Sequence, residues 1–266
     1  MNSKTLFRVY AYLRHLLTSW NTGGEGIHSP YLFYVVRMLL YDANFYYSWE
    51  RIEQRRYAML HAPKLLHTKD YGIGKACEKM VDRIAKVELE KAKNAQFFFR
   101  LIAFMGHEQQ RPLDIVELGT SLGITTSYLA LADSRNYVYT YEGCPEILAI
   151  AKQNWQKIGV ENIQAIEGNI DDTLYNIARA NRNVDFAFLD ANHQSSATWA
   201  YFQELATCAH AKSIFIVDDI HYSPYREKAW KKICDCEQVT TTMDCFDYGL
   251  VFFDPHYLKK HYRLRI

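Results

Sequence analysis

The cysteines of this sequence show neither the pattern of a zinc site nor that of a disulfide scaffold. There are six in 266 residues, which is few for a disulfide-rich fold, and no two have C-x-x-C spacing. Disulfides form and persist in oxidising compartments, whereas reduced thiols are typical of the cytoplasm. We therefore expect a cytoplasmic protein.

The sequence also lacks a long uninterrupted hydrophobic run. Near the N-terminus, Arg8, Arg14 and His15 interrupt the apolar residues before a signal-peptide core or a membrane span could accumulate. The apolar residues recur at steps of three and four instead, which predicts an amphipathic helix over residues 6–20. Its polar face is too weakly cationic to favour a membrane surface. We expect this helix to pack on the main domain, with no stable membrane insertion.

Neither charge sign is in excess, with 31 basic and 30 acidic residues. Such a balance gives no electrostatic footprint for nucleic acid, so we expect no nucleic-acid partner. The charge is unevenly distributed, because residues 1–110 carry 16 basic and 10 acidic side chains and the remainder carries 15 and 20. No internal repeat or low-complexity segment is visible. We predict a helical N-terminal extension over residues 1–110 and a main domain over residues 111–266.

The most informative stretch is LDIVELGTSLGITTSYLA, residues 113–130, which predicts a buried strand, a tight turn and the start of a helix. Gly119 and Gly123 bracket Thr120 and Ser121, so the backbone can turn sharply and a ligand can approach it closely. Such a unit forms a nucleoside or dinucleotide cradle at the carboxyl end of the strand. Ser121 replaces the middle glycine of the pyrophosphate fingerprint, which disfavours an NAD-dependent oxidoreductase.

Strand and helix signals alternate from this stretch onward. The expected segments are residues 137–142, 145–158, 163–167, 171–180, 184–190, 195–209, 213–219 and 224–234. This alternation predicts an α/β fold, doubly wound, with a mostly parallel sheet covered by helices on both faces. Two last strand-like runs, 239–246 and 250–253, are separated by a three-residue turn and predict a C-terminal antiparallel hairpin.

Several of the expected strands end in acidic residues, at the edge where open α/β sheets bind ligands. Glu142 ends the second strand, 25 residues after Glu117, where an acidic side chain can accept hydrogen bonds from ribose hydroxyls. Asp190, Asp218 and Asp219 end the fourth and fifth strands. Three nearby carboxylates repel one another unless a positive charge lies between them, and Mg²⁺ prefers oxygen ligands. We therefore expect a divalent cation there.

The glycine turn and the strand ends resemble those of class I S-adenosylmethionine-dependent methyltransferases, over about residues 113–254. The resemblance implies a seven-stranded Rossmann-like sheet whose first turn holds the amino-acid end of the cofactor. It also implies that Glu142 binds the ribose and that the residues after the third strand contact the adenine. The implied cofactor-binding residues are Glu117, Gly119, Thr120, Ser121, Gly123, Glu142, Gly168, Asn169 and Asp190. An asparagine in such a turn is also ordinary turn chemistry.

Within this class, DANH after the fourth strand and DD after the fifth resemble the metal-dependent O-methyltransferases similar to catechol O-methyltransferase. There an Asp and an Asp-Asn pair hold Mg²⁺, which implies Asp190, Asp218 and Asp219 as ligands. Asp219 departs from the pattern, as it does in sugar and macrolide O-methyltransferases. His193 has the position of the general base, which suits a side chain that titrates near neutral pH. His221 is an alternative base, although a loop histidine without a role is the simpler interpretation.

Together these features predict methyl transfer to the hydroxyl of a small acceptor, either a catechol-like phenol or a sugar. The rival interpretation is a non-catalytic cofactor-binding or interaction module on the same fold. Aromatic residues within 1–60 make a homodimer through the N-terminal helices plausible. Residues 67–75, HTKDYGIGK, predict either a lid or a helix-connecting loop, followed by a helical pattern over 76–105.

Overall fold

The computed structural model describes residues 3–20, 23–70, 75–175, 183–191 and 195–266. The chain forms two compact units. The central unit comprises Asp42–Thr173, and the terminal unit comprises Met1–Tyr41 and Leu174–Ile266. The predicted boundary at residue 110 falls inside the central unit and stays a prediction.

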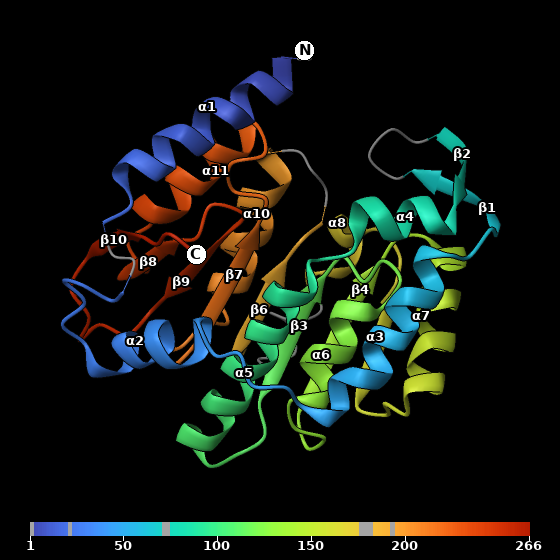
Figure 1. The fold of residues 1–266 in the computed structure, drawn as a ribbon, viewed down its shortest axis with the longest axis horizontal. Helices are drawn as coiled ribbons and strands as arrows, with labels where there is room; N and C mark the ends of the chain where they lie inside the picture. The colour runs from blue at the N-terminus through green and yellow to red at the C-terminus, as the bar shows by residue number, and fades with distance from the viewer. Residues whose placement is uncertain (1–2, 21–22, 71–74, 176–182, 192–194) are drawn as a thin grey trace. The chain divides into compact units, whose positions relative to one another are not determined.

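The central unit is built on three parallel strands in the order β3-β4-β5 (Figure 1). Its elements are α3 (Tyr47–Leu60), β1 (Leu65–Asp70), β2 (Lys75–Met80), α4 (Val81–Glu88), α5 (Ala92–Gln109), β3 (Asp114–Leu118), α6 (Ile124–Leu131), β4 (Tyr137–Glu142), α7 (Pro145–Ile158), β5 (Ile163–Glu167) and α8 (Ile170–Thr173). Helix α6 contacts β4, α7 contacts β4 and β5, and α3 contacts both helices. The three strands and α6 and α7 are therefore those that the sequence predicted.

Local signals explain where these elements begin and end. The β3 residues Ile115, Val116 and Leu118 are all buried, as expected for a parallel strand covered on both faces. Helix α7 begins at Pro145, whose fixed φ suits the first turn. It ends at Gly159, which adopts the left-handed conformation with φ +83°.

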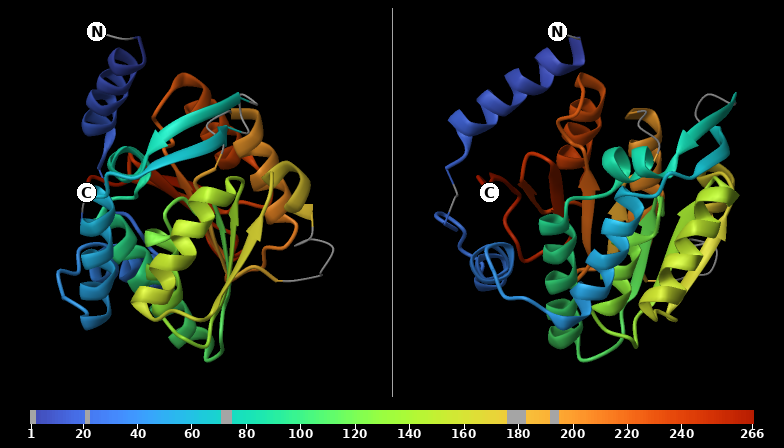
Figure 2. Two further views of the ribbon diagram at one scale, coloured as in Figure 1. Left: turned by 90° about the vertical axis from the view of Figure 1, so that its right-hand side faces the viewer. Right: turned by 45° about the vertical axis from the view of Figure 1, so that its right-hand side comes forward.

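The helix predicted over residues 76–105 is wrong at its N-terminal end. Strand β2 pairs antiparallel with β1, from Leu65 opposite Met80 to Asp70 opposite Lys75, and this hairpin extends past α4 (Figure 2). The apolar periodicity of α4 and α5 does not extend upstream of Val81, where the chain is polar and extended. The described part of the predicted lid is thus a β-hairpin and no helix-connecting loop. Residues 71–74 lie outside the described residues, and a lid role stays a prediction.

The terminal unit contains five strands in the order β10-β8-β9-β7-β6. Its elements are α1 (Ser3–Thr18), α2 (Pro30–Tyr34), the π-helix η1 (Val35–Leu40), β6 (Phe186–Leu189), α10 (Ser195–Ala206), β7 (Ile214–Asp218), α11 (Pro224–Asp235), β8 (Thr241–Asp244), β9 (Tyr248–Phe252) and β10 (Lys260–Arg263). Strand β6 is parallel to β7, and β9 is antiparallel to β7 and β8. The predicted α/β class and C-terminal hairpin are therefore confirmed. Strand β10, parallel to β8, is not among the expected strands.

Helix α1 confirms the predicted helix but not the packing of its apolar face. It lies beside α11 (Figure 1). Tyr12 makes an aromatic contact with Phe246, and other contacts of the helix are polar. Arg14 Nη2 lies 2.8 Å from Glu227 Oε2, and His15 Nε2 lies 2.9 Å from the Leu264 carbonyl oxygen. The apolar side chains that defined its amphipathic pattern are mostly exposed, among them Leu13 at 55% and Leu17 at 78%. The helix therefore packs on the main domain as expected, but most of its apolar face stays exposed.

In the described part of the chain, no helix has the length and apolar character needed to cross a bilayer. The cysteines whose side chains are described, Cys144, Cys208, Cys234, Cys236 and Cys245, are all free thiols. This agrees with the expectation that the sequence contains no disulfide scaffold.

Candidate active site

The glycine turn between β3 and α6 is fixed in place by α7. Gly123 has φ +73°, and a Cβ there would lie 2.5 Å from Trp155 Nε1. The same indole nitrogen donates a hydrogen bond of 2.9 Å to the Gly123 carbonyl, and Asn154 Nδ2 donates one of 2.8 Å to the Leu122 carbonyl. Only glycine fits this position, because both the backbone conformation and the close indole ring exclude a side chain.

Several backbone amides of the turn are already engaged within the protein. The amides of Gly119 and Thr120 both donate to the Tyr141 carbonyl at 3.1 Å. The amide of Ser121 donates to Glu142 Oε2 at 2.9 Å. A pyrophosphate would need such amides free, so the geometry agrees with the prediction that the turn disfavours a pyrophosphate. A ligand here would instead be held largely by side chains.

Glu117 is fully buried at the end of β3, at 0% exposure. Its Oε2 accepts hydrogen bonds from the hydroxyls of Thr126 at 2.5 Å and Thr140 at 2.6 Å. Its Oε1 is buried with no hydrogen-bond partner in the described structure. Burial raises the pKa of Glu117 to about 7, against the opposing effect of the two hydroxyl groups. The site therefore contains a buried acceptor atom that a ligand donor could satisfy.

Glu142, at the end of β4, has a carboxylate held in one orientation. Its Oε1 accepts from the amide of Cys144 and its Oε2 from the amide of Ser121, both at 2.9 Å. Burial raises the pKa of Glu142, while these two amides oppose the shift. Each carboxylate oxygen can accept a further hydrogen bond, which suits the predicted contact with two ribose hydroxyls.

Gly168 and Asn169 follow β5 directly, as predicted. Gly168 has φ +133°, and its amide donates to the Glu142 carbonyl at 3.0 Å. Asn169 Oδ1 accepts from the amide of Asp171 at 3.3 Å, which is the ordinary turn chemistry of an asparagine before a helix. The two residues are thus next to the end of β4 that carries Glu142.

In the terminal unit, the strand register brings Asp190 and Asp218 together. The last paired residues of β6 and β7 are Leu189 and Val217, so the two aspartates are the next pair across parallel strands, roughly 4.8 Å apart at the backbone. Asp218 is 9% exposed, and Asp219 is half-buried with φ +55°. The three aspartates do not form a group whose ligand atoms all lie within 4.8 Å, whereas one other cluster of described residues does.

The two histidines proposed as bases differ in what the structure says of them. His193 lies outside the described residues, so its role stays a prediction. His221 is 5% exposed. Its Nε2 lies 2.8 Å from Asp244 Oδ2 and its Nδ1 3.4 Å from Glu227 Oε2. Both ring nitrogens of His221 therefore face carboxylates other than the predicted metal ligands.

Sequence reasoning missed the residues that support the glycine turn. Glu88, at the end of α4, accepts from the Ser121 hydroxyl at 3.2 Å and from Lys79 Nζ at 3.1 Å. Asn154 accepts from Arg55 Nη2 at 2.8 Å while it donates to the turn. No sequence motif signals these contacts, because those of Glu88 with Ser121 and of Asn154 with Leu122 and Arg55 join segments more than 30 residues apart along the chain.

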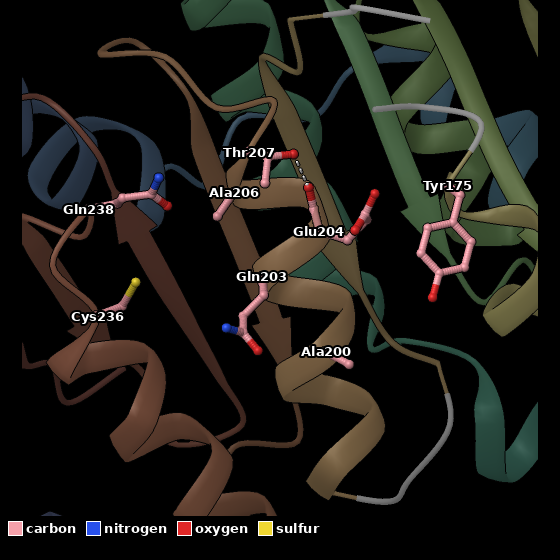
Figure 3. A pocket seen from close by; sticks show the side chains of 8 residues that line it. All are labelled: Tyr175, Ala200, Gln203, Glu204, Ala206, Thr207, Cys236 and Gln238. Carbon is pink, nitrogen blue, oxygen red and sulfur yellow. Dashed lines mark hydrogen bonds between the residues drawn. The ribbon is translucent and has the colours of Figure 1, made fainter. Parts of the chain in front are cut away.

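A hollow of about 480 Å³ lies along α10 in the terminal unit (Figure 3). Tyr175, Gln203, Glu204 and Gln238 are among its lining residues, and the Thr207 hydroxyl donates to the Glu204 carbonyl at 2.6 Å. None of the predicted site residues lines this hollow. We therefore assign the candidate site to the strand ends.

Comparison with known proteins shows what the part of the chain that carries the strand ends is similar to. Residues 116–220 match Methyltransf_24, a methyltransferase domain. This part of the chain is therefore similar to a methyltransferase domain. The match includes the glycine turn, Glu142 and the three strand-end aspartates, and it confirms the predicted enzyme class. The sequence matches no curated protein.

Solved structures show the same fold for the methyltransferase domain at low sequence identity. Cofactor-bound Rv0187 from MTB is 18% identical with a TM-score of 0.60, over 76% of this chain and 89% of that chain. An O-methyltransferase from Bacillus cereus in complex with SAH is 18% identical with a TM-score of 0.59, over 79% and 92%. TomG from Streptomyces achromogenes, an O-methyltransferase of tomaymycin synthesis in complex with SAM, is 18% identical with a TM-score of 0.55, over 76% and 97%. These likenesses confirm the predicted fold.

Proposed function

We propose that the protein transfers a methyl group from S-adenosylmethionine to the hydroxyl of a small acceptor. The observation that carries the proposal is the Glu142 carboxylate, fixed by the amides of Ser121 and Cys144 beside the glycine turn. A carboxylate held in this way can accept hydrogen bonds from ribose hydroxyls, and the turn beside it has little capacity for a pyrophosphate. The names of the structural neighbours, O-methyltransferases in complex with SAH or SAM, support the same proposal.

The residues of the central unit fit this cofactor. Glu117 Oε1 is a buried acceptor without a partner, which the cofactor's ammonium group could satisfy directly or through water. Glu142 would bind the ribose, and Gly168 and Asn169 would contact the adenine. When bound, the cofactor supplies an electrophilic methyl group on a sulfonium, which is an excellent leaving group. The protein's task is therefore to align the acceptor oxygen with that methyl group.

The proposal includes Mg²⁺ held by Asp190, Asp218 and Asp219. An all-carboxylate donor set suits a hard cation, and the register of β6 and β7 supports a shared position for two of the three residues. The ion would orient the acceptor hydroxyl and lower its pKa. His193, three residues after Asp190, is proposed to take the proton from that hydroxyl.

Calorimetric titration of the purified full-length chain tests the proposal in two steps. S-adenosylmethionine is titrated first, with Mg²⁺ and then with a chelator, and NAD is titrated as a rival ligand. We expect binding of S-adenosylmethionine in both conditions and no binding of NAD. Binding of NAD alone would contradict the proposal and favour an oxidoreductase.

Methyl transfer to a panel of catechols and sugars is then measured with Asp218→Asn and Asp219→Asn. We expect both variants to bind the cofactor and to lose turnover, while Asp235→Asn, at an exposed acid of α11, keeps it. The wild type could bind the cofactor but methylate none of the acceptors, and His193→Ala could leave the function of the protein unchanged. The non-catalytic module would then be the better interpretation. If the protein keeps its turnover in the presence of chelator, the proposed methyltransferase activity is supported and the proposed role of Mg²⁺ is contradicted.

We propose further that a second copy of this chain covers the apolar face of α1 and that the protein acts in the cytoplasm. Large apolar side chains spaced at helical intervals along α1 are exposed, namely Leu6, Val9, Tyr10, Leu13 and Leu17. Exposed apolar patches of this kind mark interaction sites more often than free surface. The reduced cysteines favour the cytoplasm as the compartment.

A further inference from the structure

A buried cluster of two histidines and one carboxylate joins α1 to the carboxyl end of β8. His15 lies in α1, His221 follows β7 and Asp244 ends β8, and their ligand atoms all lie within 4.8 Å of one another. All three residues are at most 5% exposed. We propose that this cluster binds a divalent transition-metal ion of the Zn²⁺ type. The inference does not depend on the proposed function.

The outer ring nitrogen of each histidine already faces an acceptor. His15 Nε2 lies 2.9 Å from the Leu264 carbonyl oxygen, and His221 Nδ1 lies 3.4 Å from Glu227 Oε2. Metal-binding histidines usually place their second ring nitrogen in this way, because the acceptor fixes the tautomer and orients the ring. The inner nitrogens, His15 Nδ1 and His221 Nε2, both face Asp244.

The inner side of the cluster lacks an interaction that an ion would supply. His15 Nδ1 is buried and has no hydrogen-bond partner in the described structure, and the nearest Asp244 oxygen is 3.4 Å away. An unsatisfied buried nitrogen is costly. Tetrahedral Zn²⁺ with bonds of roughly 2.1 Å places neighbouring ligand atoms roughly 3.4 Å apart. The cluster therefore needs only small side-chain shifts to reach this geometry.

The donor set indicates which ions fit. Imidazole nitrogen with one carboxylate suits Zn²⁺, Co²⁺ or Ni²⁺, whereas Mg²⁺ prefers oxygen ligands alone. Three protein ligands leave a fourth position for water or for the second oxygen of Asp244. Arg263 Nε, 3.9 Å from Asp244 Oδ2, opposes a cation, but its side chain is 45% exposed and can turn into solvent. The Phe246 ring lies 5.4 Å from both imidazole rings and shields the cluster.

An ion at this position would have a structural consequence within the terminal unit. It would connect α1, the segment between β7 and α11, and the end of β8. His221 is two residues after Asp219, so the ion would also restrain the segment that carries two of the proposed Mg²⁺ ligands.

Cobalt binding tests the inference with the purified full-length chain after treatment with a chelator. Co²⁺ is titrated in the presence of excess Mg²⁺, which occupies all-oxygen sites. We expect one equivalent to bind with the visible absorption of four-coordinate cobalt and to be displaced by Zn²⁺. His15→Gln and Asp244→Asn should each weaken binding at least roughly 100-fold. Glu227→Gln, which keeps all three proposed ligands but weakens the outer contact of His221 and the ion pairs with Arg14 and Lys231, should weaken it by roughly 10- to 100-fold.

The matched control is His256→Gln, which removes an exposed histidine paired with Asp254 at 2.8 Å and should bind Co²⁺ like the wild type. Equal binding by His15→Gln and the wild type would overturn the inference. A variant in a buried cluster can fail to fold, so zinc-edge X-ray absorption of the wild type gives a test without substitution. Two imidazole nitrogens at the zinc are expected, and an all-oxygen shell would overturn the inference.

Discussion

At the scale of single residues, Gly123 shows that the glycine turn of the candidate site depends on a residue without a side chain. It combines φ +73° with an indole nitrogen 2.5 Å from the position of a Cβ. We predict that Gly123→Ala lowers the free energy of unfolding by about 2–5 kcal/mol, from left-handed strain and overpacking together. Urea denaturation measures this change.

Gly159 is the matched control for that experiment. It has a similar φ of +83°, but the nearest atom to its Cβ position is Arg51 Nη1 at 3.8 Å. Gly159→Ala should therefore cost only the conformational strain, about 1–2 kcal/mol. Equal losses for the two variants would show that contact with Trp155 does not limit the turn.

The raised pKa of Glu117 predicts that the stability of the fold depends on pH. Its pKa in the folded state is raised to about 7 by burial, from an ordinary value of 4.5. A raised folded-state pKa means that the group stabilises the fold most below its unfolded pKa, and this stabilisation is lost as the pH rises through the folded pKa. Relative to Glu117→Gln, the wild type should lose roughly 2–3 kcal/mol of unfolding free energy between pH 5 and pH 8.

Denaturant titrations of both proteins at several pH values measure that difference. Glu161→Gln, at an exposed acid of the same unit, is the comparison, and it should follow the wild type across the range. Parallel curves for the wild type and Glu117→Gln would contradict a raised pKa at Glu117.

The candidate site was predictable from sequence only where a residue's position on a strand defines its role. Glu142 in the central unit, and Asp190 and Asp218 in the terminal unit, follow directly from the ends of apolar runs, because ligands of open α/β sheets bind beyond the carboxyl ends of the strands. The contacts of Glu88 with the glycine turn could not be predicted. They depend on how a helix packs, and neither periodicity nor turn chemistry encodes that packing.

At the scale of elements, the sequence predicted the segments whose signals agree. Strand β4, helix α7 and strand β5 have the predicted bounds, since Pro145 and Gly159 delimit the helix and apolar runs delimit the strands. Strand β10, Lys260–Arg263, was missed because most of its residues are basic and only Tyr262 is buried. Hairpin β1–β2 was missed because its largely polar segments carry no strand pattern of their own. They are extended because they pair with each other.

The exposed apolar face of helix α1 leads to a prediction about the oligomeric state. If a second copy covers its apolar face, Leu13→Gln with Leu17→Gln should convert a dimer into a monomer, because these two side chains are 55% and 78% exposed. Light scattering coupled to size exclusion measures the mass. Leu258→Gln, at an exposed leucine elsewhere in the terminal unit, should leave the dimer intact. A wild-type protein that is already a monomer would contradict the proposed partner.

At the scale of the whole molecule, the long-range polar contacts of α1 illustrate what a sequence cannot show. His15 and Asp244 are 229 residues apart, yet their side chains lie 3.4 Å from each other. The helical pattern of α1 predicted an apolar interface, whereas polar side chains anchor it and leave the apolar ones exposed. Long-range polar contacts of this kind have no local signature, because the paired residues have ordinary neighbours in the sequence.

The cofactor proposal makes a prediction for the whole molecule. A ligand that binds only the folded state at 100 times its Kd stabilises it by about 2.7 kcal/mol, which for a chain of this size corresponds to roughly 5–10 °C in melting temperature. S-adenosylmethionine should produce such a shift in differential scanning fluorimetry. Glu142→Ala should abolish most of it, because two ribose hydrogen bonds to a carboxylate are lost. Glu146→Ala, at an exposed acid four residues later, should keep the full shift. An undiminished shift in Glu142→Ala would mean that the ribose is bound elsewhere.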